Sequence, residues 1–185
     1  QIQAIFPGGI GCLTQTKESR EDDLENGWQQ LCDKHITKDD IVVGFSASGT
    51  TPFVLSILKH CRKEGIPTGC IVNNPHSPIA EWADYEVEVI TGPEFVTGST
   101  RMKAGTSQKL ILDMISTTLQ IRQGRVEGNK MVNAKLINHK LIDRACRIFM
   151  ERNSEYKDYE EVRQLILKAG SVKKAEMMIS RHFDM

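Results

Sequence analysis

Short apolar runs alternate with longer amphipathic segments through the first two thirds of the chain, and this alternation constrains the fold more than any other feature. Ile41–Phe45 is a continuous apolar run of the kind found in strands that are buried on both faces of a parallel sheet. Ile2–Phe6, Thr68–Val72 and Tyr85–Ile90 predict three further strands. Strands that alternate with helices indicate an α/β fold of three layers, a parallel sheet with helices on both faces.

Three amphipathic segments predict the helices of this fold. Ser19–Lys34 carries apolar side chains at helical spacing. Pro52–Glu64 begins with a proline, which is favoured in the first turn of a helix, and Gly65 follows as a typical C-terminal residue. A polar loop leads into a third, long helix, which we expect to end near Gly124 and to carry a wide apolar face.

The composition changes after Gly128, where the strand patterns cease and three helical stretches follow. The second stretch begins at Asp158 in a capping box, and the third begins at Ser171, a residue type that commonly caps helices. We therefore expect two domains. The first is an α/β domain over residues 1–127, and the second is a small helical domain over residues 128–185.

Charge and composition argue against several classes of partner. The chain has 24 lysines plus arginines and 24 aspartates plus glutamates, so no overall field attracts nucleic acid or an anionic membrane. Its longest apolar runs are far shorter than the roughly 20 residues that span a bilayer. The five cysteines and five histidines show no metal-binding spacing, so we expect neither a metal nor any other cofactor. Scattered cysteines also indicate reduced thiols in a cytoplasmic protein.

A turn rich in serine and threonine joins the run Ile41–Phe45 to the helix that begins at Pro52. Free backbone N–H groups and the positive end of the helix dipole make such a turn suited to a phosphate. No lysine follows it, as one would in a Walker loop, which favours a phosphate monoester on a small molecule. A purely structural helix cap is equally consistent with these residues. The candidate phosphate-binding residues are Ser46, Ser48, Gly49, Thr50 and Thr51.

The segment Gly92–Thr106 is a second candidate for anion binding. It gathers hydroxyl groups and two cations beside glycines, at the point where a loop enters the long helix. Backbone N–H groups and cationic side chains favour an anion there, whereas an ordinary helix cap with solvated basic residues is the alternative. The candidate residues are Glu94, Ser99, Thr100, Arg101 and Lys103.

A third candidate is the acidic segment Glu18–Asp23. Acidic residues are expected in the first turn of a helix for electrostatic reasons alone. The residue pattern by itself therefore does not assign a general base in this segment.

Four segments together carry a resemblance to one family: residues 46–52, residues 74–77, the run Gly92–Thr106 and residues 128–132. They resemble the N-acetylmuramic acid 6-phosphate etherases, a branch of the sugar isomerase (SIS) superfamily that is related to the glucokinase regulatory protein. The resemblance extends over almost the whole chain, and the run Gly92–Thr106 is specific to this branch. It implies a SIS-like domain over residues 1–127, a phosphosugar ligand and a homodimer.

The resemblance also implies a carbon–oxygen lyase that cleaves the D-lactyl ether of N-acetylmuramic acid 6-phosphate, giving N-acetylglucosamine 6-phosphate and D-lactate. Opening of the sugar ring acidifies a carbon-bound proton; a carboxylate removes it, an acid assists the departure of lactate, and water adds to the alkene. Residues 19–22 are similar to the family motif Gly-Ala-Glu-Asp, which implies that Glu21 is one of two active-site glutamates. The resemblance further implies contacts to phosphate or sugar by Ser46, Ser48 and Thr51, and to sugar hydroxyls by Glu94.

The beginning of the chain bears on the activity that we expect. Gln1 is not an initiator methionine, and the chain reads as a strand from its second residue, which predicts a partial sequence. By the resemblance, the second glutamate and a first phosphate turn precede Gln1. We therefore expect the 185-residue chain alone to be inactive and the full-length protein to be an enzyme.

Two alternative functions share the fold and the phosphate turn. One is a non-catalytic phosphosugar-binding regulator similar to the glucokinase regulatory protein, and the other is an aldose–ketose phosphosugar isomerase. Glu21 and the intact serine-rich turn favour an etherase over a regulator. The run Gly92–Thr106 and the helical C-terminal part weigh against an isomerase.

Overall fold

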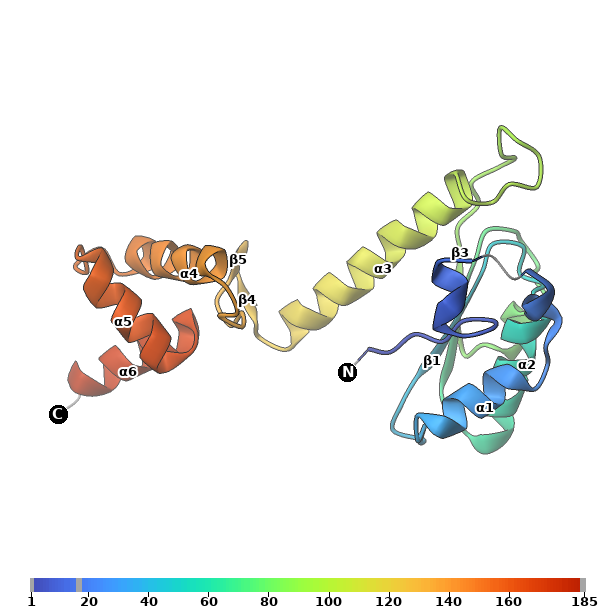
Figure 1. The fold of residues 1–185 in the computed structure, drawn as a ribbon, viewed down its shortest axis with the longest axis horizontal. Coiled ribbons are helices and arrows are strands. Elements are labelled where there is room, and N and C mark those ends of the chain that lie inside the picture. The colour runs from blue at the N-terminus through green and yellow to red at the C-terminus, as the bar shows by residue number, and fades with distance from the viewer. Residues whose placement is uncertain (1, 16–17, 184–185) are drawn as a thin grey trace. The chain divides into compact units, whose positions relative to one another are not determined.

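A computed structural model describes residues 2–15 and 18–183, and it confirms the α/β fold with a parallel sheet (Figure 1). The sheet has the order β1 (Val42–Ser46), β2 (Thr68–Val72) and β3 (Tyr85–Glu88), and both neighbouring pairs are parallel. Its flanking elements are η1 (Ile10–Leu13), η2 (Glu18–Asp22), α1 (Asn26–Asp33), α2 (Pro52–Glu64) and η3 (Ala80–Trp82). The later elements are α3 (Lys103–Arg122), β4 (Val126–Glu127), β5 (Lys130–Met131), α4 (His139–Arg152), α5 (Tyr159–Ala169) and α6 (Val172–Phe183).

The described chain forms two compact units, residues 1–112 and residues 113–185. The division at residues 127 and 128 that the sequence suggests remains a prediction. Among the described residues, no helix combines the length and the apolar character that a membrane crossing requires.

The sheet and α2 form the centre of the first unit. Every residue of β2 is buried, as expected for the middle strand of a parallel sheet. Cys70 and Val72 of this strand pack with Leu58 of α2 and with Ile79. Helix α1 lies against α2 and extends this core, which places α2 between α1 and the sheet. The core therefore fixes the direction of α2 and the turn that precedes it.

Helix α2 has the predicted bounds because its two ends carry strong local signals. Pro52 occupies the first turn, where its missing N–H group leaves no unsatisfied bond. Gly65 ends the helix with φ of 70°, a left-handed conformation that glycine adopts without strain. Gly44 lets α2 approach β1, since a Cβ at this position would lie 2.5 Å from a side-chain carbon of Val54.

Three predictions of secondary structure are wrong, and the first concerns the beginning of the chain. Residues 2–6 form no strand. The carbonyl of Phe6 instead accepts hydrogen bonds from the N–H of Gly9 in a tight turn and from the side chain of Gln30 on α1. An apolar run becomes a strand only where a neighbouring strand can satisfy its backbone groups.

The second correction concerns the helix predicted over Ser19–Lys34, which is two separate elements, η2 and α1. Asp23 causes the break, because its carboxylate accepts hydrogen bonds from the N–H groups of Glu25 and Asn26 at 3.3 and 3.0 Å. An aspartate that bonds nearby N–H groups favours the start of a new helix over continuation of the old one.

The third correction concerns the segment after α3, where the sequence suggests no strand beyond Gly128. Strands β4 and β5 pair there as an antiparallel hairpin, with Val126 opposite Met131. The two-residue turn Gly128–Asn129 closes the hairpin, and Gly128 has φ of 58°. Strands of two residues are too short to produce an alternating apolar pattern.

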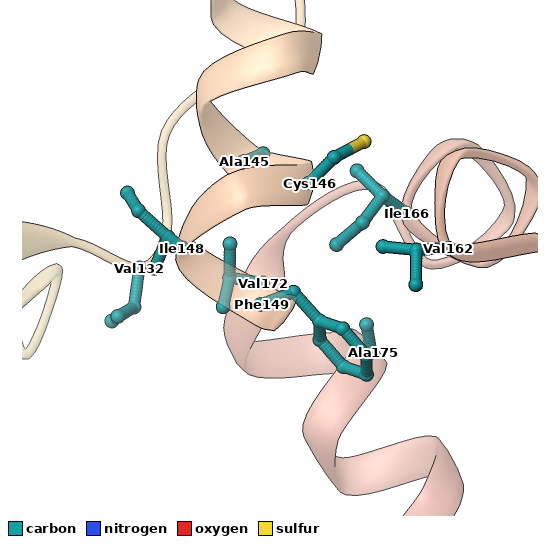
Figure 2. Packing of buried hydrophobic residues seen from close by; sticks show 9 residues of the cluster. All are labelled: Val132, Ala145, Cys146, Ile148, Phe149, Val162, Ile166, Val172 and Ala175. Carbon is teal, nitrogen blue, oxygen red and sulfur yellow. The ribbon is translucent and has the colours of Figure 1, made fainter. Parts of the chain in front are cut away.

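The second unit is built around a core between α4, α5 and α6 (Figure 2). Phe149 is fully buried in it and meets Tyr156 edge-on, with ring centroids 5.3 Å apart. Two predicted caps are confirmed, because Asp158 accepts a hydrogen bond from the N–H of Glu161 and Ser171 accepts one from Lys174. The remaining buried residues are Val132, Ala145, Cys146, Ile148, Val162, Ile166, Val172 and Ala175.

Candidate functional site

The candidate site is formed where the three parallel strands of the first unit end. Residues 46–51 leave the carboxyl end of β1, residues 73–79 leave β2, and residues 89–102 leave β3. Ligands of open α/β sheets bind at this edge, because loops and helix N-termini converge there. Two of the segments that the sequence singles out thus emerge from the same edge of the sheet.

The turn over residues 46–51, which we term the serine turn, is held by its own hydroxyl groups. The hydroxyl of Ser46 is buried and lies 2.8 Å from the hydroxyl of Thr51 and 3.3 Å from that of Ser48. It also accepts a hydrogen bond from the N–H of Gly49 at 3.0 Å. Ser48 and Thr50 are exposed and bond to each other, at 2.9 Å between their hydroxyl oxygens.

The serine turn leads directly into the N-terminus of α2. Thr51 is the N-cap residue, yet no side chain accepts a hydrogen bond from the first turn of α2 in the part of the chain that the structure describes. The first N–H groups of a helix need partners from outside the helix, and an anion is a favourable one. The turn therefore presents hydroxyl groups and helix N–H groups from one short segment.

Gly49 allows the serine turn to touch the loop that follows β2. A Cβ at Gly49 would lie 2.0 Å from the hydroxyl oxygen of Ser77, and φ at this residue is 72°. The loop after β2 also forms hydrogen bonds with the backbone of the serine turn. The carbonyl of Ala47 accepts hydrogen bonds from the N–H of Asn73 and the side chain of Asn74, and the carbonyl of Gly49 accepts one from Ile79.

We predict that Gly49→Ala lowers the free energy of unfolding by about 1–3 kcal/mol, because it combines overpacking with backbone strain. Gly9→Ala is the matched control, since Gly9 has φ of 75° but no atom within 4 Å of the added carbon. Urea denaturation of both variants separates the strain that they share from the clash with Ser77. Equal losses of stability would contradict the close contact between Gly49 and Ser77.

The segment after β3 is organised by Glu94. Its two carboxylate oxygens accept hydrogen bonds from the N–H groups of Lys103 and Ala104, each at 3.0 Å. Glu94 therefore caps the first turn of α3 from nine residues upstream. The side chain of Lys103 donates to the carbonyl of Pro93 at 2.9 Å, which is a second bond between the start of the loop and the start of α3. Binding of sugar hydroxyls by Glu94 remains a prediction, whereas these contacts give the carboxylate a structural role.

The cap contributed by Glu94 predicts a pH dependence. Backbone hydrogen bonds from Ala104 and Lys103 lower the pKa of Glu94 below its ordinary value. The cap therefore stabilises the fold above the unfolded-state pKa of about 4.3, and this contribution is lost as the pH falls through the lowered pKa of the folded state. We expect the free energies of unfolding of the chain and of Glu94→Gln to converge between about pH 5 and pH 2 in urea titrations. A constant difference over this range would contradict the cap.

The remaining candidates of this loop lie largely on its surface. Thr100, Arg101 and Lys103 are exposed, and Ser99 is half-buried. The guanidinium group of Arg101 makes no hydrogen bond or ion pair with another residue that the structure describes. Its positive charge is not neutralised by another described residue and can therefore bind an anion, so Arg101 stays a candidate ligand.

Glu21 lies on η2, which packs against α2. Its side chain is exposed and forms no hydrogen bond or ion pair within the described ranges. The neighbouring Arg20 pairs with Asp23 at 3.7 Å. The connection of Glu21 to the serine turn is therefore indirect, through α2.

Two hollows on the surface of the first unit lie away from the serine turn. One of about 530 Å³ is lined by residues 4–6 and 8–10, by Arg20 and by residues of α1, and one of about 560 Å³ lies beside Trp28 and His60. No residue of the serine turn lines either hollow. Neither hollow therefore belongs to the candidate site at the ends of the strands.

Sequence reasoning missed the residues that join the loops. Asn73, Ser107 and Gln108 connect the ends of β2 and β3 to α3. The signal available for them is the pair Asn73–Asn74 directly after a buried strand, because amides at a strand end bond neighbouring backbone groups.

Comparison with known proteins shows what this chain is similar to. Residues 27–117 match the SIS domain. A curated N-acetylmuramic acid 6-phosphate etherase of Bacteroides thetaiotaomicron is 51% identical over 181 residues, which are 98% of this chain and 65% of the relative. One from Porphyromonas gingivalis is 51% identical over 173 residues, 93% of this chain and 62% of the relative. One from Yersinia pestis is 47% identical over 150 residues, 81% of this chain and 51% of the relative. The chain thus spans less than two thirds of the length of these relatives.

Proposed function

We propose that the protein cleaves the D-lactyl ether of N-acetylmuramic acid 6-phosphate, since residues 27–117 match the SIS domain and the chain is about half identical to curated etherases of that sugar phosphate. The products are N-acetylglucosamine 6-phosphate and D-lactate. The observation that carries the proposal is 51% identity across 98% of the chain. The serine turn at the end of β1 supports it, because an etherase of this kind needs a site for a phosphate monoester.

The phosphate is bound, in this proposal, by the serine turn and the N-terminus of α2. Ser48 and Thr50 offer exposed hydroxyl groups, and the first N–H groups of α2 offer donors with a favourable dipole. Ser46 and Thr51 hold the turn in shape and present further hydroxyls to the phosphate. Arg101 and Lys103 add positive charge from the loop after β3.

The reaction is an elimination followed by addition of water. The open-chain aldehyde acidifies the proton on the adjacent carbon, and Glu21 removes that proton as a general base. The electron pair forms an alkene as the bond to the lactyl oxygen breaks, and a second acid donates a proton to the departing lactate. Water then adds across the alkene, so that the overall change is hydrolysis of an ether.

We further propose a cytoplasmic homodimer that binds a phosphosugar and not nucleic acid. Equal numbers of acidic and basic residues support the last point. Helix α3 supports a dimer, because six of its apolar side chains are between 37% and 62% exposed and apolar helices are normally covered. These residues are Leu110, Leu112, Met114, Ile115, Leu119 and Ile121.

Titration calorimetry with three sugar phosphates tests the proposed substrate class. We expect N-acetylmuramic acid 6-phosphate and its product N-acetylglucosamine 6-phosphate to bind, and fructose 6-phosphate to bind more weakly. Preferential binding of fructose 6-phosphate, without release of lactate from the lactyl ether, would contradict the proposal and favour a phosphosugar-binding regulator or an isomerase.

A further inference from the structure

The side chain of Asn73 is buried at the carboxyl end of β2, and both polar atoms of its amide are hydrogen-bonded. The residue is 6% exposed. Its side-chain nitrogen donates to the carbonyl of Val89 at 2.9 Å and to the hydroxyl of Ser107 at 2.8 Å. Its side-chain oxygen accepts from the amide of Gln108 at 2.9 Å. All these contacts lie within the first compact unit.

These bonds connect the three parts of the candidate site. The backbone N–H of Asn73 holds the serine turn through Ala47, while its side chain holds the end of β3 through Val89 and the first turns of α3. Ser107 continues the chain of bonds, since its hydroxyl donates to the carbonyl of Ala104 at 2.7 Å. Ala104 is one of the two residues that Glu94 caps.

We propose that Asn73 is a positioning residue, which sets the loop over residues 89–102 and the start of α3 relative to the serine turn. The proposal rests on the proposed function, because it assigns Asn73 to the phosphosugar site. Asn73 does not contact the ligand in this proposal. It fixes the distance between the group that holds the phosphate and the groups that face the sugar.

Asn74 and Thr68 distinguish positioning from ordinary structural support. Asn74 is exposed, and among the described residues its side chain bonds only the carbonyl of Ala47, so it holds the serine turn but not α3. Thr68 is fully buried at the opposite end of β2, where its hydroxyl bonds Trp82 and Asp84. Asn73 and Thr68 are therefore similar in burial and bonding, but only Asn73 lies at the site.

The test compares Asn73→Ala, Asn74→Ala and Thr68→Val for binding of inorganic phosphate and of N-acetylglucosamine 6-phosphate. We expect Asn73→Ala to weaken binding of the sugar phosphate by about tenfold and binding of inorganic phosphate by less, because the serine turn keeps its own bonds while Glu94, which faces the sugar, shifts with the loop after β3. Asn74→Ala should weaken both ligands equally. Thr68→Val should lower the melting temperature as Asn73→Ala does, without this selectivity.

Hydrogen exchange gives a second readout that does not need a ligand. We expect the amides of Lys103 and Ala104 to exchange about tenfold faster in Asn73→Ala, and to be unaffected by Thr68→Val once the loss of global stability is subtracted. Faster exchange in both variants, or equal weakening of the two ligands by Asn73→Ala, would overturn the positioning role. Should the unaltered full-length protein bind neither ligand, the proposed function fails, and the exchange of Lys103 and Ala104 still decides whether Asn73 sets the start of α3.

Discussion

Replacement of Glu21 by glutamine is expected to lower the rate of D-lactate release by about 10²–10⁴-fold, the usual contribution of a general base. Glutamine keeps the size and polarity of the side chain but cannot accept the proton. Because Glu21 is exposed and unpaired in the described part of the chain, the substitution should leave the melting temperature unchanged. The measurement is a lactate-release assay with N-acetylmuramic acid 6-phosphate on the full-length protein.

Glu25→Gln is the matched control for this prediction. Glu25 is also an exposed glutamate, four residues further along, and its side chain caps no helix. We expect it to retain the full rate, and both variants to bind N-acetylglucosamine 6-phosphate with unchanged affinity. A Glu21→Gln protein that releases lactate at the full rate would remove Glu21 from the mechanism.

Replacement of Phe149 by alanine is expected to lower the free energy of unfolding of the helical unit by about 3–5 kcal/mol, the usual cost of emptying a buried aromatic site. Phe149 is fully buried and lies among residues from α4, α5 and α6, so that no single helix can close the cavity (Figure 2). The substitution also removes the edge-on contact between the rings of Phe149 and Tyr156. A loss of this size is a large part of the stability of a typical domain.

The two tryptophans make it possible to tell which unit loses stability in Phe149→Ala. Trp28 and Trp82 both belong to the first unit, so their fluorescence reports on its unfolding, whereas circular dichroism also reports the helices of the second. In urea we expect Phe149→Ala to shift the dichroism transition and not the fluorescence transition. Leu167→Ala, at a half-exposed position of α5, should cost less than about 1 kcal/mol. Equal shifts of both signals would contradict two independently packed units.

Local signals explain which parts of the fold were predictable. Helix α2 and strand β2 have the predicted bounds, because Pro52 and Gly65 mark the ends of the helix and the apolar run Cys70–Val72 marks the strand. Residues 2–6 have an equally good strand pattern, yet pairing with a neighbour decides whether such a run becomes a strand. The hairpin of β4 and β5 was missed because strands of two residues are too short to show an alternating apolar pattern.

The candidate site was predictable in its parts but not in its assembly. The serine turn could be recognised because hydroxyl groups and a helix start are adjacent in the sequence. The role of Glu94 as the cap of α3 could not, since it depends on a bond across nine residues of loop. The bonds of Asn73 to Ser107 and Gln108 join residues more than thirty positions apart, which only the folded chain brings together.

The most direct test of the central claim is the release of D-lactate from N-acetylmuramic acid 6-phosphate by the full-length protein, with the 185-residue chain assayed beside it. We predict that the full-length protein releases one lactate for each N-acetylglucosamine 6-phosphate formed, and that the 185-residue chain alone releases none. A full-length protein that binds N-acetylglucosamine 6-phosphate but never releases lactate would contradict the etherase assignment and identify the site as one for binding alone.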